Sequence, residues 1–193
     1  MTTILLARHG ETDWNREGRF QGHADPPLND TGRGQAAALA SELAGVELAA
    51  VYSSPLRRAL ETAEAVAAEH GLEPVEVDAL REVDVGSWQG MTRTEVEARF
   101  PEQLARWLDY DQGWQDGESY EEMGRRVVSA LLALAAAHPD ERILAVTHGG
   151  PIRAAYAFAD GTSHADARRL GPRIGNVFVA RFAVEDEALR RLD

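Results

Sequence analysis

Close to its start the chain contains Ile4-Leu5-Leu6-Ala7-Arg8-His9-Gly10-Glu11-Thr12, an apolar run joined directly to polar residues. Four consecutive apolar residues predict a strand that is buried on both faces of a sheet. A glycine after the histidine lets a ligand approach the backbone. The segment Ile143-Leu144-Ala145-Val146-Thr147-His148-Gly149-Gly150 has the same arrangement. The two segments therefore predict buried strands whose histidines are neighbours if the strands are adjacent.

Strand-like and helix-like segments alternate along the rest of the chain. Further short apolar runs predict strands at 49–52, 75–77 and 177–180. Helical spacing and capping patterns predict helices at 33–43, at 55–69 and from Ser119 to about 137, where Ser119 and Glu122 form a capping box. This alternation predicts an α/β fold, a three-layer α/β/α sandwich around a mainly parallel central sheet.

Several details of this fold can be predicted as well. The apolar runs at 4–7 and 143–146 are the expected central strands, and the polar tail 188–192 is the expected antiparallel edge. Pro55 and Pro151 are expected in the first turns of two helices. The segment 85–117 holds Trp88, Trp107 and Trp114, which we expect to pack with one another. It predicts a short, lid-like helical insertion over the carboxyl edge of a single domain, 1–193.

The cysteine count, the net charge and the lengths of the apolar runs exclude or disfavour several classes of protein. The 193 residues contain no cysteine, which excludes disulfides and thiolate metal sites. A net charge of −12 disfavours nucleic acid and anionic membranes as partners. The apolar run before Arg8 is too short for a signal peptide, and no run has the length of about 20 residues that a membrane helix needs. We therefore expect a cytoplasmic protein.

The residues that carry chemistry follow the predicted strands. Ligand sites in open α/β sheets lie beyond the carboxyl ends of the strands, where His9 and His148 are expected. An arginine of the pair Arg57 and Arg58 follows a third strand, and the loop from Leu80 to Gly90 carries carboxylates. Arginines and histidines around one cavity suit a dianion such as a phosphate, and a carboxylate beside them suits an acid. The same arginines argue against a metal ion in that cavity.

These residues resemble the signature of the histidine phosphatase superfamily, the phosphoglycerate mutase-like proteins. Arg8-His9-Gly10-Glu11-Thr12 is the first of six motifs in the family order, which together cover residues 3 to about 183. The others include Arg19-Phe20-Gln21-Gly22, Leu28-Asn29-Asp30-Thr31-Gly32, Ser54 to Ala63, Leu80-Arg81-Glu82 with Gly86-x-Trp88-x-Gly90, and Thr147-His148-Gly149-Gly150.

The resemblance implies a role for each matching residue. His9 is implied as the nucleophile that becomes phosphorylated on a ring nitrogen. Arg8 and Arg58 are implied to clamp the phosphoryl oxygens, with His148 as a second histidine donor. The family arginine directly precedes an alanine, and this match favours Arg58 over Arg57.

The remaining implied positions bind substrate or move protons. Those at the phosphate site are Asn15, Gln21, Gly22 and Gly149. Glu82 matches the proton donor to the leaving group, with Asp84 as the alternative acid. A histidine nucleophile must be neutral, so its other ring nitrogen is expected to donate to a carbonyl near Gly10.

Three functions stay open. The first is a phosphatase that needs no metal or cofactor and hydrolyses a small phosphorylated metabolite. The second is a mutase that returns the phosphoryl group to another hydroxyl of the substrate, although the segment 86–92 resembles the phosphatase branch. The third is a catalytically silent domain that binds a phosphorylated ligand. Specificity is expected from 85–117 and from a loop at 159–175, and the oligomeric state is open, with a homodimer as one outcome.

Overall fold

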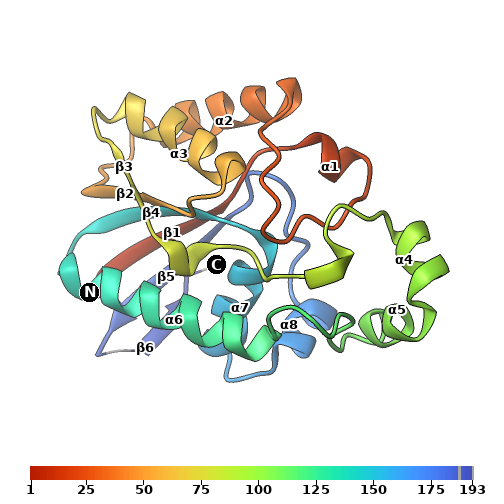
Figure 1. Cartoon of the computed structure of the whole chain (residues 1–193). Coiled ribbons are helices and arrows are strands. Elements are labelled where there is room, and N and C mark those ends of the chain that lie inside the picture. Colours follow the sequence, from red (N-terminus) through yellow and green to blue (C-terminus); the bar gives the residue numbers. More distant parts are fainter. Residues whose placement is uncertain (187, 193) are drawn as a thin grey trace.

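A six-stranded mixed sheet forms the centre of the protein (Figure 1), in a computed structural model that describes residues 1–186 and 188–192. The strands are β1 (Thr2–Arg8), β2 (Ala50–Ser53), β3 (Pro74–Glu76), β4 (Arg142–Thr147), β5 (Val179–Glu185) and β6 (Ala188–Arg191). Their order across the sheet is β3-β2-β4-β1-β5-β6. The first four strands run parallel, whereas β5 and β6 pair antiparallel to their neighbours. The predicted central strands and the antiparallel edge are confirmed.

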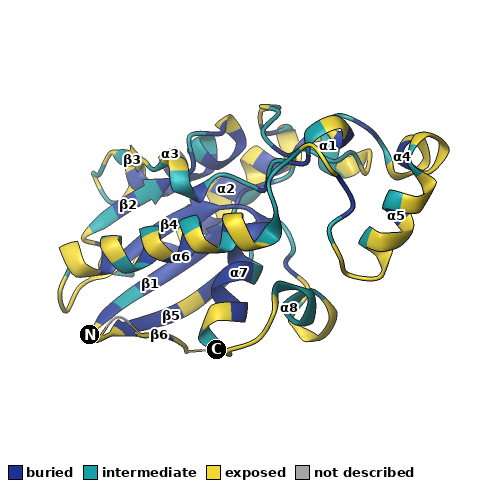
Figure 2. Ribbon diagram, turned by 60° about the horizontal axis from the view of Figure 1, so that its bottom comes forward, coloured by how far each residue is buried: buried dark blue, intermediate teal, exposed yellow. Residues whose placement is uncertain are grey.

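Helices cover both faces of this sheet, which confirms the predicted three-layer sandwich (Figure 2). One face is covered by α2 (Asp30–Leu43) and α3 (Arg57–Glu69), and the other by α6 (Tyr120–Ala137) and α7 (Gly149–Ala159). Successive side chains of a strand point to opposite faces. Accordingly, Leu5 packs in the core beneath α2 and α3, whereas Ile4 and Leu6 pack beneath α6 and α7.

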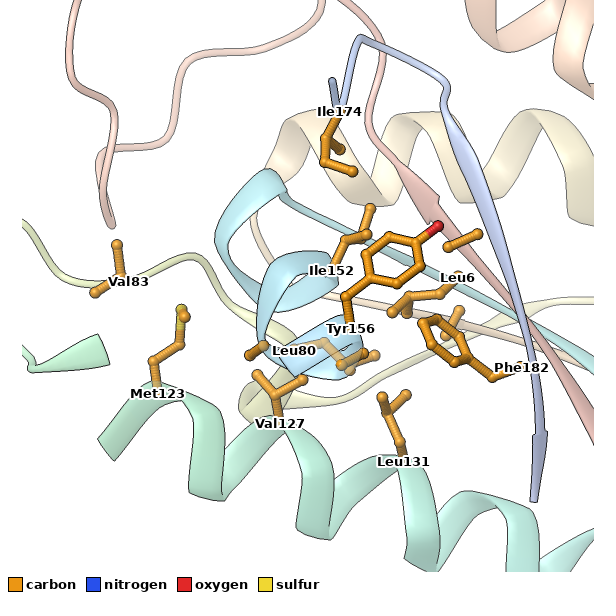
Figure 3. Close-up of a cluster of buried hydrophobic side chains, with 14 of the residues drawn as sticks. Leu6, Leu80, Val83, Met123, Val127, Leu131, Ile152, Tyr156, Ile174 and Phe182 are labelled. Carbon is orange, nitrogen blue, oxygen red and sulfur yellow. The ribbon is translucent and has the colours of Figure 1, made fainter. Parts of the chain in front are cut away.

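The core beneath α6 and α7 holds α7 in place against the sheet (Figure 3). Leu6 and Phe182 from the strands pack there with Leu131 of α6 and with Ile152 and Tyr156 of α7. All five side chains are buried. This packing sets the first turn of α7 at the carboxyl end of β4.

The register between β1 and β4 brings the two strand ends together. Arg8 is the partner of Thr147, and the N–H of His9 donates to the Thr147 carbonyl at 3.0 Å. The residues that follow, His9 and His148, are therefore neighbours, as the sequence predicted.

The segment 85–117 contains η2 (Gly86–Trp88), α4 (Arg93–Arg99) and α5 (Pro101–Leu108). Figure 1 shows α4 and α5 together beyond one end of the sheet. Trp88 is fully buried, and its ring meets those of Trp107 and Trp114 edge-on at 6.4 and 5.7 Å. The three tryptophans pack with one another, as expected.

Three local predictions were wrong. Pro55 lies outside α3, because the extended residue Leu56 is the N-cap and the helix begins at Arg57. Val177 lies before β5, since its φ of 51° belongs to the left-handed region and not to a strand. The expected loop at 159–175 contains α8 (His164–Leu170).

The shorter elements are α1 (Asp13–Arg16) and η1 (Asp78–Leu80). Within the described residues, no helix combines the length and apolar character required to cross a membrane.

Candidate active site

A cavity of about 400 Å³ opens at the carboxyl ends of the parallel strands. His9 follows β1 directly, Arg58 lies in the first turn of the helix after β2, Glu82 follows η1, and Gly150 lies at the start of α7 after β4. Because these four elements end or begin at the same edge of the sheet, the cavity collects residues that are far apart in the sequence.

His9 forms the floor of the cavity and is buried there. Its Nδ1 donates to the carbonyl of Gly10 at 2.6 Å, which is the hydrogen bond expected near that residue. Burial, together with the nearby charges of Arg58 and Arg8, holds the pKa of His9 well below its usual value. The ring is therefore neutral at pH 7, and the lone pair of its Nε2 is free of a proton.

Two arginines beside His9 are held rigidly by the backbone. Arg58 is fully buried and donates to the carbonyls of Ala24 at 2.7 Å and Gly22 at 2.9 Å. Burial lowers its pKa to about 10, so it stays charged at pH 7. Arg8 donates to the carbonyl of Ile174 at 2.9 Å. The Nε atoms of both arginines are buried and have no hydrogen-bond partner among the described residues, as expected for donors that await an anion.

His148 lies behind His9, with 5.1 Å between the ring centroids. Its Nε2 is hydrogen-bonded to Ser54 Oγ at 2.8 Å, whereas its buried Nδ1 has no partner within the described part of the chain. Burial and the charge of Arg58 hold the pKa of His148 well below its usual value. The neutral ring therefore keeps one nitrogen without a protein partner, next to His9.

The carboxylate of Glu82 forms part of the cavity wall and is oriented by backbone donors. It accepts hydrogen bonds from the N–H groups of Val83 at 2.9 Å and Gly150 at 3.2 Å. Asp84 instead accepts from the N–H of Gly86 at 2.9 Å and does not line the cavity. Of the two candidate acids, Glu82 lines the cavity and Asp84 does not.

Gly10 has a different role from the one expected. A Cβ at this position would lie 2.6 Å from the carbonyl oxygen of Gly32, in the first turn of α2. The missing side chain therefore allows a close approach of α2 to the strand end, and Gly10 does not line the cavity.

Charge in the cavity is strongly asymmetric. Its wall includes five arginines, namely Arg8, Arg19, Arg58, Arg153 and Arg168, but a single carboxylate, that of Glu82. In the described ranges, no group of three or more His, Asp or Glu side chains is placed to hold a metal ion. The arrangement therefore suits an anion.

The family model of the histidine phosphatase superfamily (branch 1) matches residues 4–193. The chain belongs to this superfamily. Phosphoserine phosphatase 1 of Hydrogenobacter thermophilus is 38% identical over 158 residues, which are 81% of this chain and 75% of that protein. These matches confirm the family resemblance seen in the sequence.

Solved structures agree with this membership. Bacillus stearothermophilus YhfR superposes with a TM-score of 0.92 at 32% identity, over 100% of this chain and 96% of that one. A mycobacterial glucosyl-3-phosphoglycerate phosphatase in complex with VO3 superposes with a TM-score of 0.86 at 32% identity, over 97% and 95%. The fold class and the expected class of enzyme, a phosphatase, are thereby confirmed.

The histidine phosphatase fold brings most of the predicted site residues to the cavity wall. These are Arg8, His9, Asn15, Gln21, Gly22, Arg58 and Glu82. His148 and Gly149 are not part of the wall, where Gly150 takes their place. Arg57 is exposed and lies 3.4 Å from Glu61 on the surface.

The outer half of the cavity contains Arg153, His164 and Arg168. Specificity was expected from 159–175, which includes His164 and Arg168, but none of the three residues was predicted individually. Helical spacing could have revealed Arg153, which is one turn after Gly149 and donates to its carbonyl at 3.2 Å. The pattern Ser163-His164-Ala165-Asp166 is typical of a helix N-terminus and could have revealed α8. No pattern in the sequence around these residues predicts that α7 and α8 meet at one cavity.

Proposed function

We propose that this phosphatase hydrolyses small phosphomonoesters in two steps, through a phosphohistidine on Nε2 of His9. The observation that carries the proposal is the neutral His9 ring, whose Nδ1–H is engaged by the Gly10 carbonyl while Nε2 keeps its lone pair. Phosphoryl transfer depends mainly on positioning and charge neutralisation, which Arg8, Arg58 and His148 supply.

In the first step the lone pair of His9 Nε2 forms a bond to phosphorus, and the ester P–O bond breaks. The electron pair of that bond stays on the leaving oxygen, which takes the proton of Glu82. The cycle therefore starts with Glu82 as a neutral carboxylic acid, a form that the bound phosphate dianion favours. Arg8 and Arg58 hold the non-bridging oxygens, and the free Nδ1 of His148 donates a further hydrogen bond. The alcohol then leaves.

In the second step water attacks the phosphorus, and the P–N bond breaks with its electron pair returning to Nε2. Glu82, now a carboxylate, takes the proton of the attacking water. The products are inorganic phosphate and an enzyme in its starting protonation state. No step draws on a metal ion or cofactor.

The substrate class follows from the cavity and the relatives. A cavity of about 400 Å³ admits a small metabolite. Two similar proteins are a phosphoserine phosphatase and a glucosyl-3-phosphoglycerate phosphatase, and both names denote phosphate esters of small metabolites. Hydrolysis is favoured over the mutase alternative because three of the matching relatives are named phosphatases of a specific metabolite, whereas one is named a phosphoglycerate mutase-like protein.

Rapid quenching with ³²P-labelled substrate tests the proposal. The wild-type protein should carry an acid-labile, base-stable label, and His9→Ala should lose both the label and phosphate release. His70→Ala, at the C-cap of α3 away from the cavity, is the matched control and should keep both. Normal phosphate release by His9→Ala would contradict the proposed nucleophile, and label transferred to a second substrate hydroxyl would indicate a mutase.

Three further expectations belong to this proposal. The segment 85–117, whose Trp107 and Trp114 line the cavity, acts as a lid on a single domain that spans 1–193. The protein works in the cytoplasm without a nucleic-acid or membrane partner. Pairing into a homodimer is tested by light scattering in solution.

A further inference from the structure

The outer half of the cavity contains cationic side chains that the proposed reaction does not use. Arg153 comes from α7, and Arg168 comes from α8 together with the imidazole of His164. All three side chains lie in the wall of the same cavity as His9. They are candidates for binding a part of the substrate other than the reacting phosphate.

Unpaired polar atoms gather in this outer half as they do around His9. Buried side-chain atoms without a hydrogen-bond partner in the described ranges include Nε of Arg153 and Nη1 of Arg168. The ring nitrogens of His164 form no well-aligned hydrogen bond, although the backbone of Gly150 lies close enough to act on the ring. The same feature occurs at Arg8 and Arg58 in the wall beside His9 and at His148 behind it, where the phosphoryl group is expected. Buried donors usually have partners, so the outer group indicates a second ligand position.

Arg168 is held rigidly toward the cavity by aromatic rings. Its guanidinium carbon lies 4.8 Å from the ring centre of Trp107, 5.5 Å from that of Tyr110 and 5.4 Å from that of Tyr120. Its Nη2 donates to the Trp107 carbonyl at 3.2 Å, which leaves Nη1 free. Tyr120 in turn stacks on His164, with 4.0 Å between the ring centroids. A guanidinium fixed in this way is pre-organised for an anion.

Charge balance supports the same conclusion. Of the five arginines in the wall, Arg19 forms salt bridges with Glu17 and Glu95, and Arg8 and Arg58 lie beside His9. Arg153 and Arg168 form no salt bridge within residues 1–186 and 188–192. The charge of Glu82 acts on Arg153 without forming an ion pair with it. A partly buried cation without an ion-pair partner is unfavourable, and an anionic ligand group would lower that cost.

We propose that Arg153, Arg168 and His164 form a second anion subsite, which binds a carboxylate or a second phosphate of the substrate. The preferred substrates are then phosphomonoesters that carry another anionic group besides the reacting phosphate. This inference rests on the proposed function, because it names the class of ester that the same cavity selects.

His164 suits this subsite as a neutral hydrogen-bonding group. Burial and the charges of Arg168 and Arg153 lower its pKa to about 3, so the ring is uncharged at pH 7. The two arginines supply the charge, and a neutral imidazole N–H beside them can donate to the same oxygen atoms.

Matched substrate pairs test the subsite. The first pair is 3-phosphoglycerate and glycerol 3-phosphate, which differ in a carboxylate against a hydroxymethyl group. The second pair is propane-1,3-diol bisphosphate and its monophosphate. Wild-type protein should prefer the more anionic member of at least one pair by kcat/KM, and the pair that shows the preference identifies the anionic group.

Arg168→Met keeps the apolar stem against the rings and removes the charge. It should reduce that preference by roughly 10- to 100-fold, the usual worth of a hydrogen bond to a charged group. Arg153→Met should act in the same direction and serves as a second variant if the first fails to fold. Arg169→Met, on the same helix but paired with Asp166 at the surface, is the control and should keep the preference.

The possible failures are distinguishable. Turnover without any preference in either pair, or a preference that both Met variants retain in full, would overturn the subsite alone. Absence of phosphate release from every ester, including p-nitrophenyl phosphate, would overturn the proposed function and the subsite with it.

Discussion

Gly150→Ala should impair proton donation by Glu82 while leaving the binding of the phosphoryl group intact. A Cβ at this position would lie 2.2 Å from Glu82 Oε1, 3.3 Å from the carboxyl carbon of Glu82 and 3.0 Å from Met123 Sδ. Ordinary van der Waals contact begins at 3.4 Å, so the carboxyl group must retreat by about 1 Å. Gly150 is part of α7, where alanine is also favourable, and the effect therefore comes from the added methyl group.

The size of the effect follows from this displacement. A misplacement of about 1 Å can cost roughly 10²-fold in rate, and complete loss of a general acid costs roughly 10²–10⁴-fold. We expect kcat/KM for an alkyl phosphate to fall by about 10²-fold in Gly150→Ala, with Glu82→Gln as the upper limit. The loss for p-nitrophenyl phosphate should be far smaller, because its leaving group departs without a proton.

The assay compares kcat/KM for glycerol 3-phosphate and p-nitrophenyl phosphate in each variant, because kcat also reflects hydrolysis of the phosphoenzyme. Gly124→Ala is the matched control. It lies in α6, and its Cβ would meet only Ala154 Cβ, at the comfortable distance of 3.8 Å. Equal losses for the two esters, or no loss for either, would contradict the displacement argument if seen in Gly150→Ala. The same result in Glu82→Gln would show that Glu82 is not the acid.

Arg58→Met should lower kcat/KM for alkyl and aryl phosphates alike, by roughly 10²–10³-fold, because the proposed role of Arg58 is to hold the phosphoryl oxygens of every substrate. Assays of phosphate release measure this effect. Dialysis against EDTA should leave activity unchanged and vanadate should inhibit, whereas recovery only with an added divalent ion would contradict a metal-free mechanism. His164, with its pKa lowered from 6.5 to about 3, binds more protons when unfolded, so the free energy of unfolding should fall below pH 6.5. Urea denaturation from pH 4 to 7 measures how steeply the free energy of unfolding changes with pH. His164→Gln should make this dependence less steep, by at most about 1.4 kcal/mol per pH unit.

The amino-acid sequence by itself determined the central sheet and the inner half of the site. The apolar run 4–7 and the run 143–146 are stable only when both faces of their strands are covered, which makes them central parallel strands. Parallel strands share one carboxyl edge, and His9 and His148 therefore had to meet. The predicted starts of a helix at Pro55 and of a strand at Val177 were wrong, because the backbone conformation of a single residue decides where each element begins.

The outer half of the site was decided only by the tertiary structure. Arg168 meets the carbonyl of Trp107 across 61 positions of sequence, and Arg153 joins them from a third element. The direction of a side chain on a helix follows from how that helix is rotated and packed on the sheet. That rotation depends on the whole core, including Ile152 and Tyr156 beneath α7, and not on the few residues that surround each arginine.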